Sequence, residues 1–229
     1  MIAVTILVTL VAHATKIQTR SSEVLKMRVS KEKSAENRKA LLQAASQLFR
    51  QRGIDGVGVA EVAKAAGLTH GALYAHFPSK EALVAEAFSY GFEANVAETR
   101  VLEQAHTSSF DEYLKGLFSK GTRDRLETGC PMSASASEIA RQGDALSERF
   151  ADAFEEVVAM FEKSLEPSLT TSERRQLAVA ASAAQIGAIA VSRAVAKADK
   201  ALADEVLEAS HDAIAAVCKV PATDRASPI

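Results

Sequence analysis

The side chains best suited to chemistry gather between residues 69 and 80. Hydroxyl, imidazole, phenol and ammonium groups follow one another there, on Thr69, His70, Tyr74, His76 and Lys80. Such groups hydrogen-bond to phosphate oxygens and to base edges in the major groove of DNA. Gly71 and Ala72 are the small residues among them, and Gly71 permits close approach of the backbone to a ligand. The stretch therefore predicts a nucleic-acid contact surface.

Two of these residues have a plainer alternative interpretation. Tyr74 is alternatively a core aromatic whose hydroxyl reaches the surface, and His76 a surface histidine without a ligand. Leu68, Leu73 and Phe77 lie between the polar residues and are expected in the core.

Patterns typical of catalysis or of metal binding are weak or incomplete. His70 and His76 do not have the i, i+4 spacing that places two metal ligands on one helix face. Residues 56–58 (Gly-Val-Gly) start a dinucleotide-binding motif, but Glu61 occupies the third glycine position. The chain has neither a Walker A sequence nor a G-x-S-x-G elbow. We therefore expect no enzyme activity, no catalytic residue, no metal site and no cofactor.

Short helices are expected to position the contact residues. Apolar residues recur at the spacing of one helix face over residues 41–49, and this helix is expected to end near Gly53. Two shorter helices are expected near residues 59–66 and 69–77, separated by Gly67.

Pro78 cannot continue the second short helix, and Ser79 is expected to cap a long helix that follows. A helix, a turn and a second helix are the layout of a helix-turn-helix. In such motifs the start of the second helix enters the major groove. Here that start carries Thr69 and His70.

The composition restricts the fold class. The 229 residues are 48% apolar and 24% charged, as in a packed soluble protein, with only 11 Gly and 5 Pro. So few turn-forming residues leave little material for an all-β fold. We expect an all-α protein with an N-terminal three-helix DNA-binding domain, followed by a larger helical domain. Its further helices are expected near residues 110–125, 131–142, 144–165, 171–198 and 202–217.

Charge is unevenly distributed. Residues 28–81 contain 9 Lys or Arg against 5 Asp or Glu, whereas residues 82–229 contain 15 against 23. A basic N-terminal part joined to an acidic remainder is typical of a polyanion-binding module. The alternative is a solvated surface on which the charges are unevenly distributed.

The chain ends are expected to lie outside the fold. Residues 2–11 form an apolar run too short to span a bilayer as a helix. A secretory signal requires a basic residue before its apolar run, but no Lys or Arg precedes Lys16. We expect residues 1–30 to be a disordered or misassigned extension, with translation starting at Met27. Residues 221–229 are expected to be a disordered tail.

Residues 66–83 carry a set of residue types at fixed spacing. Ala66-Gly67 precedes Thr69, and Tyr74, Phe77 and Lys80-Glu81 follow. Together they resemble the DNA-binding signature of TetR/AcrR-type transcriptional regulators, Ser/Thr-x-G-x-hydrophobic-Y-x-[HY]-F-x-x-K-E-x-L after a small-residue turn. The resemblance covers about residues 38–83. The remainder agrees only in being helical, acidic and of suitable length.

This resemblance implies a cytoplasmic, homodimeric repressor that a small-molecule or redox signal releases from a palindromic DNA operator, without a role for membranes. Residues 31–83 would bind DNA, and residues 84–220 would bind the effector and dimerise. A helical small-molecule-binding protein, an enzyme or a scaffold without DNA function is the alternative. The implied DNA contacts are Lys33, Arg38, Gly58, Val59, Thr69, His70, Gly71, Ala72, Tyr74, His76 and Lys80.

Gly58 departs from the family pattern, in which Ser or Thr is common at this position. A glycine offers no side-chain cap and no hydroxyl for a phosphate. Backbone N–H groups at the helix start would have to bind the phosphate instead.

Residues 178–198 are unusually small, because 13 of the 21 are Ala, Gly or Ser. One interpretation is a helix buried within the protomer, and the other is a symmetric helix–helix dimer interface, which the resemblance favours.

Cys130 lies between Gly129 and Pro131 and is expected to cap a helix. The positive end of the helix dipole, with Arg123 and Arg125 nearby in sequence, would lower the pKa of its thiol. Some regulators of the resembling kind sense electrophiles or oxidants with such a cysteine, and an inert gap-filling residue is the alternative. Some of the aromatic residues between positions 82 and 165 are expected to line a ligand pocket, and most to form core.

Overall fold

The computed structural model describes residues 30–105 and 110–219, and all regular structure within these ranges is helical. The all-α prediction is confirmed. Residues 1–29 of the expected extension, with the alternative start at Met27, and the expected tail at residues 221–229 lie outside the described residues.

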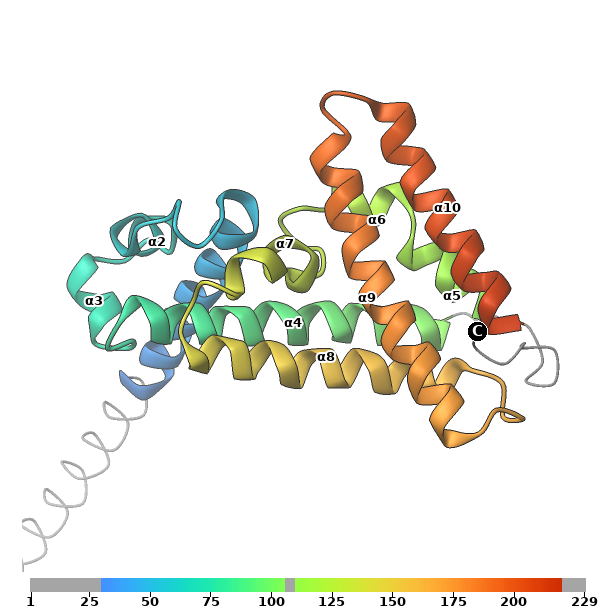
Figure 1. Ribbon diagram of the computed structural model, residues 1–229. Coiled ribbons are helices and arrows are strands. Elements are labelled where there is room, and N and C mark those ends of the chain that lie inside the picture. Colours follow the sequence, from blue (N-terminus) through green and yellow to red (C-terminus); the bar gives the residue numbers. More distant parts are fainter. Residues whose placement is uncertain (1–29, 106–109, 220–229) are drawn as a thin grey trace, which may run out of the picture.

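The N-terminal part has the predicted order of helices. A helix over residues 30–52 is followed by α2 (Val59–Ala65), α3 (His70–Tyr74) and the long α4 (Lys80–Ala105). Figure 1 shows α2 and α3 together at one end of the molecule, beside the first helix.

Local hydrogen bonds account for where these helices begin and end. Gly67 has a φ of 71°, as expected for a residue that closes a helix in the left-handed region. The hydroxyl of Thr69 accepts a hydrogen bond from the N–H of Ala72 at 3.2 Å, and that of Ser79 accepts from Ala82 at 3.2 Å. The end of α2 and the starts of α3 and α4 are thereby determined by the local sequence.

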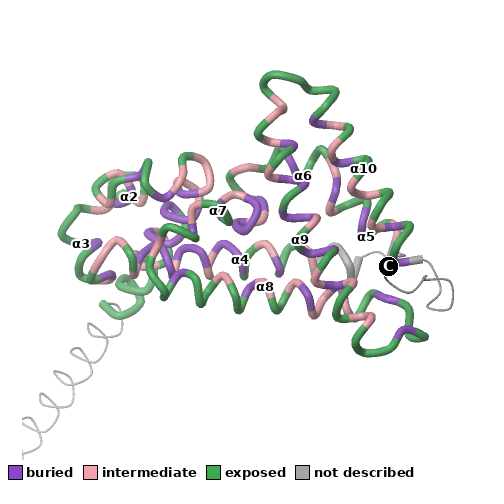
Figure 2. Tube along the Cα trace, viewed as in Figure 1, coloured by how far each residue is buried: buried purple, intermediate pink, exposed green. Residues whose placement is uncertain are grey.

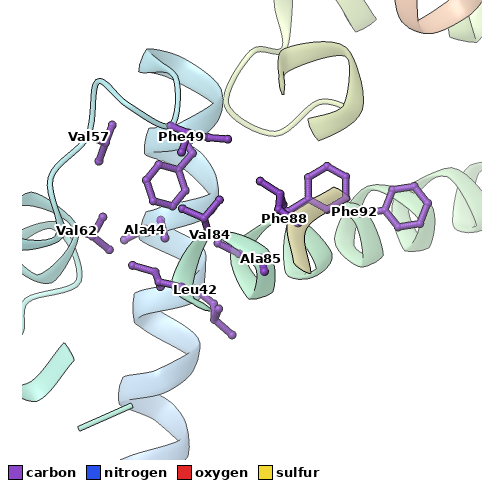
Figure 3. Close-up of a cluster of buried hydrophobic side chains, with 14 of the residues drawn as sticks. Leu42, Ala44, Phe49, Val57, Val62, Val84, Ala85, Phe88 and Phe92 are labelled. Carbon is purple, nitrogen blue, oxygen red and sulfur yellow. The ribbon is translucent and has the colours of Figure 1, made fainter. Parts of the chain in front are cut away.

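A shared hydrophobic core holds the first helix, α2 and α3 against α4. Figure 3 shows Ala44 and Phe49 of the first helix close to Val62 of α2 and Val84 of α4. Leu73 and Phe77 are fully buried, as predicted, and Leu68 is half-buried. The same core continues along α4 to Phe88 and Phe92 and joins the N-terminal helices to the rest of the chain.

The larger part contains α5 (Phe110–Leu117), α6 (Lys120–Asp124), α7 (Pro131–Ile139), α8 (Asp144–Ser164), α9 (Thr171–Val195) and α10 (Lys200–Lys219). In Figure 1, α8 runs alongside α4, while α9 crosses them and pairs with α10. Figure 2 shows that buried residues follow the facing sides of these helices.

The single helix predicted near residues 110–125 is wrong, because two helices occupy this stretch. Ser119 interrupts it with an extended backbone (ψ 154°), and its hydroxyl accepts a hydrogen bond from the N–H of Thr122 at 3.1 Å. The hydroxyl of Thr122 in turn donates to the carbonyl of Gly116 at 2.8 Å. This exchange of side-chain for backbone hydrogen bonds competes with a continuous helix.

The small-residue helix α9 is buried on one face only. Ala181, Ser182 and Ser192 of that face pack within the protomer, whereas Gly187 and Val191 of the opposite face are exposed. By length and composition α9 could span a membrane, but a helix packed in a bundle gives the same signal, and α9 lies against α8 and α10. The buried-helix interpretation thus holds for one face.

Candidate nucleic-acid interface and ligand cavity

The start of α3 presents its polar residues to solvent. Thr69, His70 and Gly71 are exposed, and the ring of His70 meets that of Tyr74 edge-on at 5.0 Å between centroids. Tyr74 is 47% exposed, so the core interpretation of this residue is wrong. Leu73 points the other way and is fully buried, which fixes α3 against the core with its polar face outward.

The remaining residues of the predicted contact set border this face. Ala72, His76 and Lys80 are half-buried, and Lys33 on the first helix is exposed. The ring of His76 lies tilted to that of Phe77, with 6.4 Å between centroids. The DNA contact at His76 stays a prediction.

Gly58 is the N-cap of α2 and has extended backbone (φ −87°, ψ 149°) without a side-chain cap. A Cβ atom at this position would meet no atom within 4 Å, and Val59 beside it is half-buried. The backbone at the start of α2 is therefore open to solvent, as an approaching phosphate would require.

Arg38 differs from the other predicted contacts because it already has partners within the protein. Its guanidinium pairs with the carboxylate of Glu86 on α4 and lies 4.8 Å from the ring centroid of Phe77. These contacts tie the first helix to α4 and to the segment after α3.

The helix-turn-helix is connected to the larger part of the chain through α7. The Glu138 carboxylate accepts a hydrogen bond from the N–H of Ile54 at 2.9 Å, and Gln142 approaches Asp55 at 3.4 Å. In the second contact the amide of Gln142, just after α7, donates to the carboxylate of Asp55, and both contacts reach the turn that precedes α2. Sequence analysis missed these residues, because nothing local distinguishes Glu138 from any exposed helical glutamate.

A second connection starts from the first helix. The guanidinium of Arg50 donates to the carbonyl of Gly129 at 3.2 Å. Gly91 of α4 permits this crossing, because a Cβ there would collide with the side chains of Ser46 and Arg50. Gly129, next to Cys130, is therefore in direct contact with the first helix.

A cavity of 510 Å³ opens among the helices of the larger part. It is lined from α4, α5, α6, α8, α9 and the segment that leads into α7. The surface that lines the cavity is mostly apolar, as is typical of sites for small organic molecules.

The structure separates lining aromatics from core aromatics. Phe92, Tyr113 and Phe161 line the cavity, and the rings of Tyr113 and Phe161 meet edge-on at 5.7 Å. Phe88 and Phe150 instead pack against each other in the core, with 5.9 Å between ring centroids.

Cys130 is the N-cap of α7, with Pro131 at the first helical position, as predicted, and it lines the cavity. The predicted lowering of its pKa is wrong. Burial raises the pKa of the Cys130 thiol, and this outweighs the opposite effects of the backbone N–H groups of Ser133 and Met132 and of the charge on Arg193.

The basic neighbours of Cys130 are also not the predicted ones. Arg123 is buried in ion pairs with Asp124 and Asp204, and Arg125 pairs with Glu98. The nearby charges are instead those of Arg50 and Arg193, and burial lowers the pKa of both guanidinium groups.

Arg193 anchors the cavity wall to α9. Its guanidinium donates to the carbonyls of Arg123 at 2.8 Å and of Thr122 at 3.2 Å. The segment between α6 and Cys130 is thereby fixed to the helix that carries the small-residue stripe.

Within residues 30–105 and 110–219, no three His, Cys, Asp or Glu side chains lie close enough together to hold a metal ion.

Two family models match the chain. The model described as "Bacterial regulatory proteins, tetR family" matches residues 41–87, and "Transcriptional regulator LmrA/YxaF-like, C-terminal domain" matches residues 107–204. The first covers the helix-turn-helix, and the second covers most of the cavity and α9.

Curated relatives match different shares of the chain. The regulator AcrR of Shigella flexneri is 38% identical over 78 residues, which are 34% of this chain and 36% of AcrR. The regulator LmrA of Bacillus subtilis is 28% identical over 134 residues, which are 57% of this chain and 71% of LmrA. The chain thus matches only about a third of the length of AcrR.

Solved structures agree in fold. A TetR-family regulator from Cytophaga hutchinsonii has a TM-score of 0.68 at 23% identity, covering 82% of this chain and 98% of its own. The reduced form of Escherichia coli NemR has a TM-score of 0.66 at 22% identity, covering 81% and 98%. At these identities the likeness concerns the arrangement of helices.

Proposed function

Because this chain belongs to the TetR family of bacterial regulatory proteins, we propose that it is a DNA-binding transcriptional regulator and not an enzyme. It represses transcription by binding to an operator. The observation that carries this proposal is the orientation of α3. Its buried Leu73 fixes a face on which Thr69, His70 and Tyr74 are exposed at the position from which a helix-turn-helix reads DNA. Residues 31–83 are the proposed DNA-binding domain and residues 84–220 the effector and dimerisation domain.

The proposed contacts divide into base reading and phosphate positioning. His70 offers a ring donor and acceptor to base edges, and Gly71 allows the backbone to approach. Lys33, Lys80 and the open backbone at Gly58 and Val59 serve the phosphates. Thr69, Ala72, Tyr74 and His76 complete the proposed contact face, and Arg38 contributes through its packing between the first helix and α4.

The proposed active form is a homodimer. In a single protomer Gly187 and Val191 of α9 and Leu202 of α10 are exposed, and Val191 and Leu202 are 49% and 42% exposed. A second copy would bury this apolar face, and a two-fold dimer requires a palindromic operator because protein symmetry is mirrored in the site.

The proposed signal is a small molecule in the 510 Å³ cavity. An effector that binds the DNA-incompetent arrangement more tightly shifts the population away from the operator. The cavity wall at Gly129 contacts Arg50 of the first helix, which supports a direct route from the cavity to the DNA-binding domain.

A second candidate signal is an electrophile or oxidant at Cys130, because this thiol lines the cavity at the start of α7. The raised pKa of the thiol lowers its thiolate fraction and favours the non-covalent signal. Treatment with a quinone separates the two. Release of operator by wild type but not by Cys130→Ser supports covalent sensing, and equal behaviour of both proteins refutes it.

The proposal as a whole is tested by selecting genomic fragments with the purified protein. We expect an inverted repeat, bound with an affinity that falls steeply with salt because neutralised phosphates release counterions. Absence of any salt-sensitive duplex binding refutes the proposal. The cytoplasmic location proposed for a DNA-binding protein is tested by fractionating cells.

A further inference from the structure

One polar side chain on the inner wall of the cavity, that of Gln185, has no hydrogen-bond partner among the described residues. Five lining residues are buried: Phe92, Val96, Gly129, Phe161 and Gln185. Among these described residues Gln185 is the only one with a polar side chain, and it is 5% exposed. None of the described groups donates a hydrogen bond to its amide or accepts one from it.

A buried amide without partners is costly. Folding removes its donors and acceptor from bulk water, and the loss is not repaid unless hydrogen bonds replace those to water. Gln185 of α9 lines the cavity together with Phe92 and Phe161, so a molecule in the cavity can reach its amide. Natural cores seldom keep such groups without a use.

The charges around the cavity indicate which molecules it excludes. Glu112 and Arg125 are the charged lining residues in the described part of the chain, and both are exposed. Arg125 is already paired with Glu98 at 2.7 Å. Arg50 and Arg193 lie near Cys130 but do not line the cavity. A charged group placed against Gln185 would therefore lose its hydration without meeting a charged side chain among the described buried lining residues.

We infer that Gln185 is the polar anchor of the cavity, and that the cavity takes a neutral, mostly apolar molecule whose hydroxyl or carbonyl group hydrogen-bonds to this amide. The amide supplies both a donor and an acceptor, so either group finds a partner. The rings of Phe92, Tyr113 and Phe161 provide the apolar contact area. A cavity of 510 Å³ is of the size that holds one small organic molecule.

The test uses two probes of the same shape, 2-naphthol and 2-methylnaphthalene, which differ in one hydroxyl. The chain contains no Trp, so the fluorescence of both naphthalenes can be followed without an indole background. We expect wild type to prefer 2-naphthol, and Gln185→Met, which keeps the length of the side chain, to lower this preference about tenfold. The charged probe 2-naphthoate should bind more weakly than 2-naphthol.

Two matched variants control the comparison. Gln176→Met makes the same change on an exposed part of α9 and should leave both affinities unchanged. Met160→Leu alters the apolar wall and should change both affinities by the same factor, so that their ratio is kept.

Three results would overturn the inference: an equal preference in wild type and Gln185→Met, tighter binding of 2-naphthoate than of 2-naphthol, or no binding of any probe. The inference rests on the proposed function only in naming the cavity as the effector site, and the titrations need no DNA. Failure to bind any operator would refute the proposed regulator function alone. Operator binding with an unchanged probe preference in Gln185→Met would refute the proposed role of Gln185 alone.

Discussion

The carboxylate of Glu138 on α7 accepts a hydrogen bond from the backbone N–H of Ile54 at 2.9 Å. This contact joins residues 84 positions apart in the sequence and connects the helix after the cavity wall to the turn before the helix-turn-helix. Gly53, next to Ile54, has a φ of 78° and leaves no room for a Cβ beside the same carboxylate. The turn and α7 are thus fitted to each other.

Replacing Glu138 by Ala should weaken operator binding and reduce the response to the effector. Ile54 is 3% exposed, so its N–H would lose its partner in a buried place, at a cost of about 1–3 kcal/mol. Glu138→Gln keeps an acceptor oxygen and should stay close to wild type. The measurement is operator titration with and without effector. Wild-type affinity and response in Glu138→Ala would show that this contact does not transmit the signal.

His70→Ala and Lys80→Ala should affect DNA binding differently. Loss of a base contact at His70 should change the preferred base pair at one position of the operator, whereas loss of a phosphate contact at Lys80 should weaken all sequences alike and reduce the salt slope by about 1. Binding of a library of operator variants at several salt concentrations checks both. An unchanged base preference in His70→Ala would remove this residue from base reading.

The thiol of Cys130 should react slowly with iodoacetamide at neutral pH. Because burial raises its pKa, the thiolate should form only as the pH rises above the ordinary cysteine value of about 8.5. The rate of alkylation measured against pH gives the pKa, and Cys130→Ser supplies the background from Cys218, which is buried. An alkylation rate that reaches its maximum at a pH below the ordinary cysteine pKa would support the interpretation based on the helix dipole.

Asp204 should make the protein sensitive to acid. Hydrogen bonds from Lys120 and Arg123, at 2.7 Å and 2.6 Å, lower the pKa of its carboxyl group. A carboxyl with a lowered pKa stabilises the fold above its unfolded value of about 3.9, and this stabilisation is lost as the pH falls through the folded value. Asp204→Asn should be less stable than wild type at neutral pH, and the difference should shrink on acidification. Urea unfolding at several pH values checks this, and a constant difference would contradict it.

Gly187→Arg should separate the protomers if the exposed face of α9 forms the dimer interface. Apart from the adjacent backbone of α9, no described atom lies within 4 Å of a Cβ at this position, so the arginine should leave the protomer folded and add a charge to the interface. Ala188 is 6% exposed within the protomer, so an arginine there would disrupt folding and could not test the interface. Light scattering gives the mass, with Ser172→Arg on the exposed start of α9 as the control. A dimeric Gly187→Arg that still binds operator would exclude this face.

The helix-turn-helix was predictable because its boundaries are local. Thr69, Gly67 and Ser79 act within a few residues of their own positions, through a hydroxyl, a left-handed φ and a second hydroxyl. The spacing of apolar residues likewise predicted Leu73 and Phe77 as core. The break at Ser119 escaped prediction, since the apolar residues before it keep a helical spacing and no proline marks the break.

Burial was decided by the tertiary structure alone. The sequence placed Cys130 at a helix start, but helices that meet only in the folded chain bury its thiol and reverse the direction of its pKa shift. The same holds for Glu138, whose partner is 84 residues away, and for Gln185, which lines the cavity and has no hydrogen-bond partner among the residues that the structure describes. Capping and periodicity act over one or two turns of the chain and can be seen in the sequence, whereas desolvation depends on segments that are distant until the chain has folded.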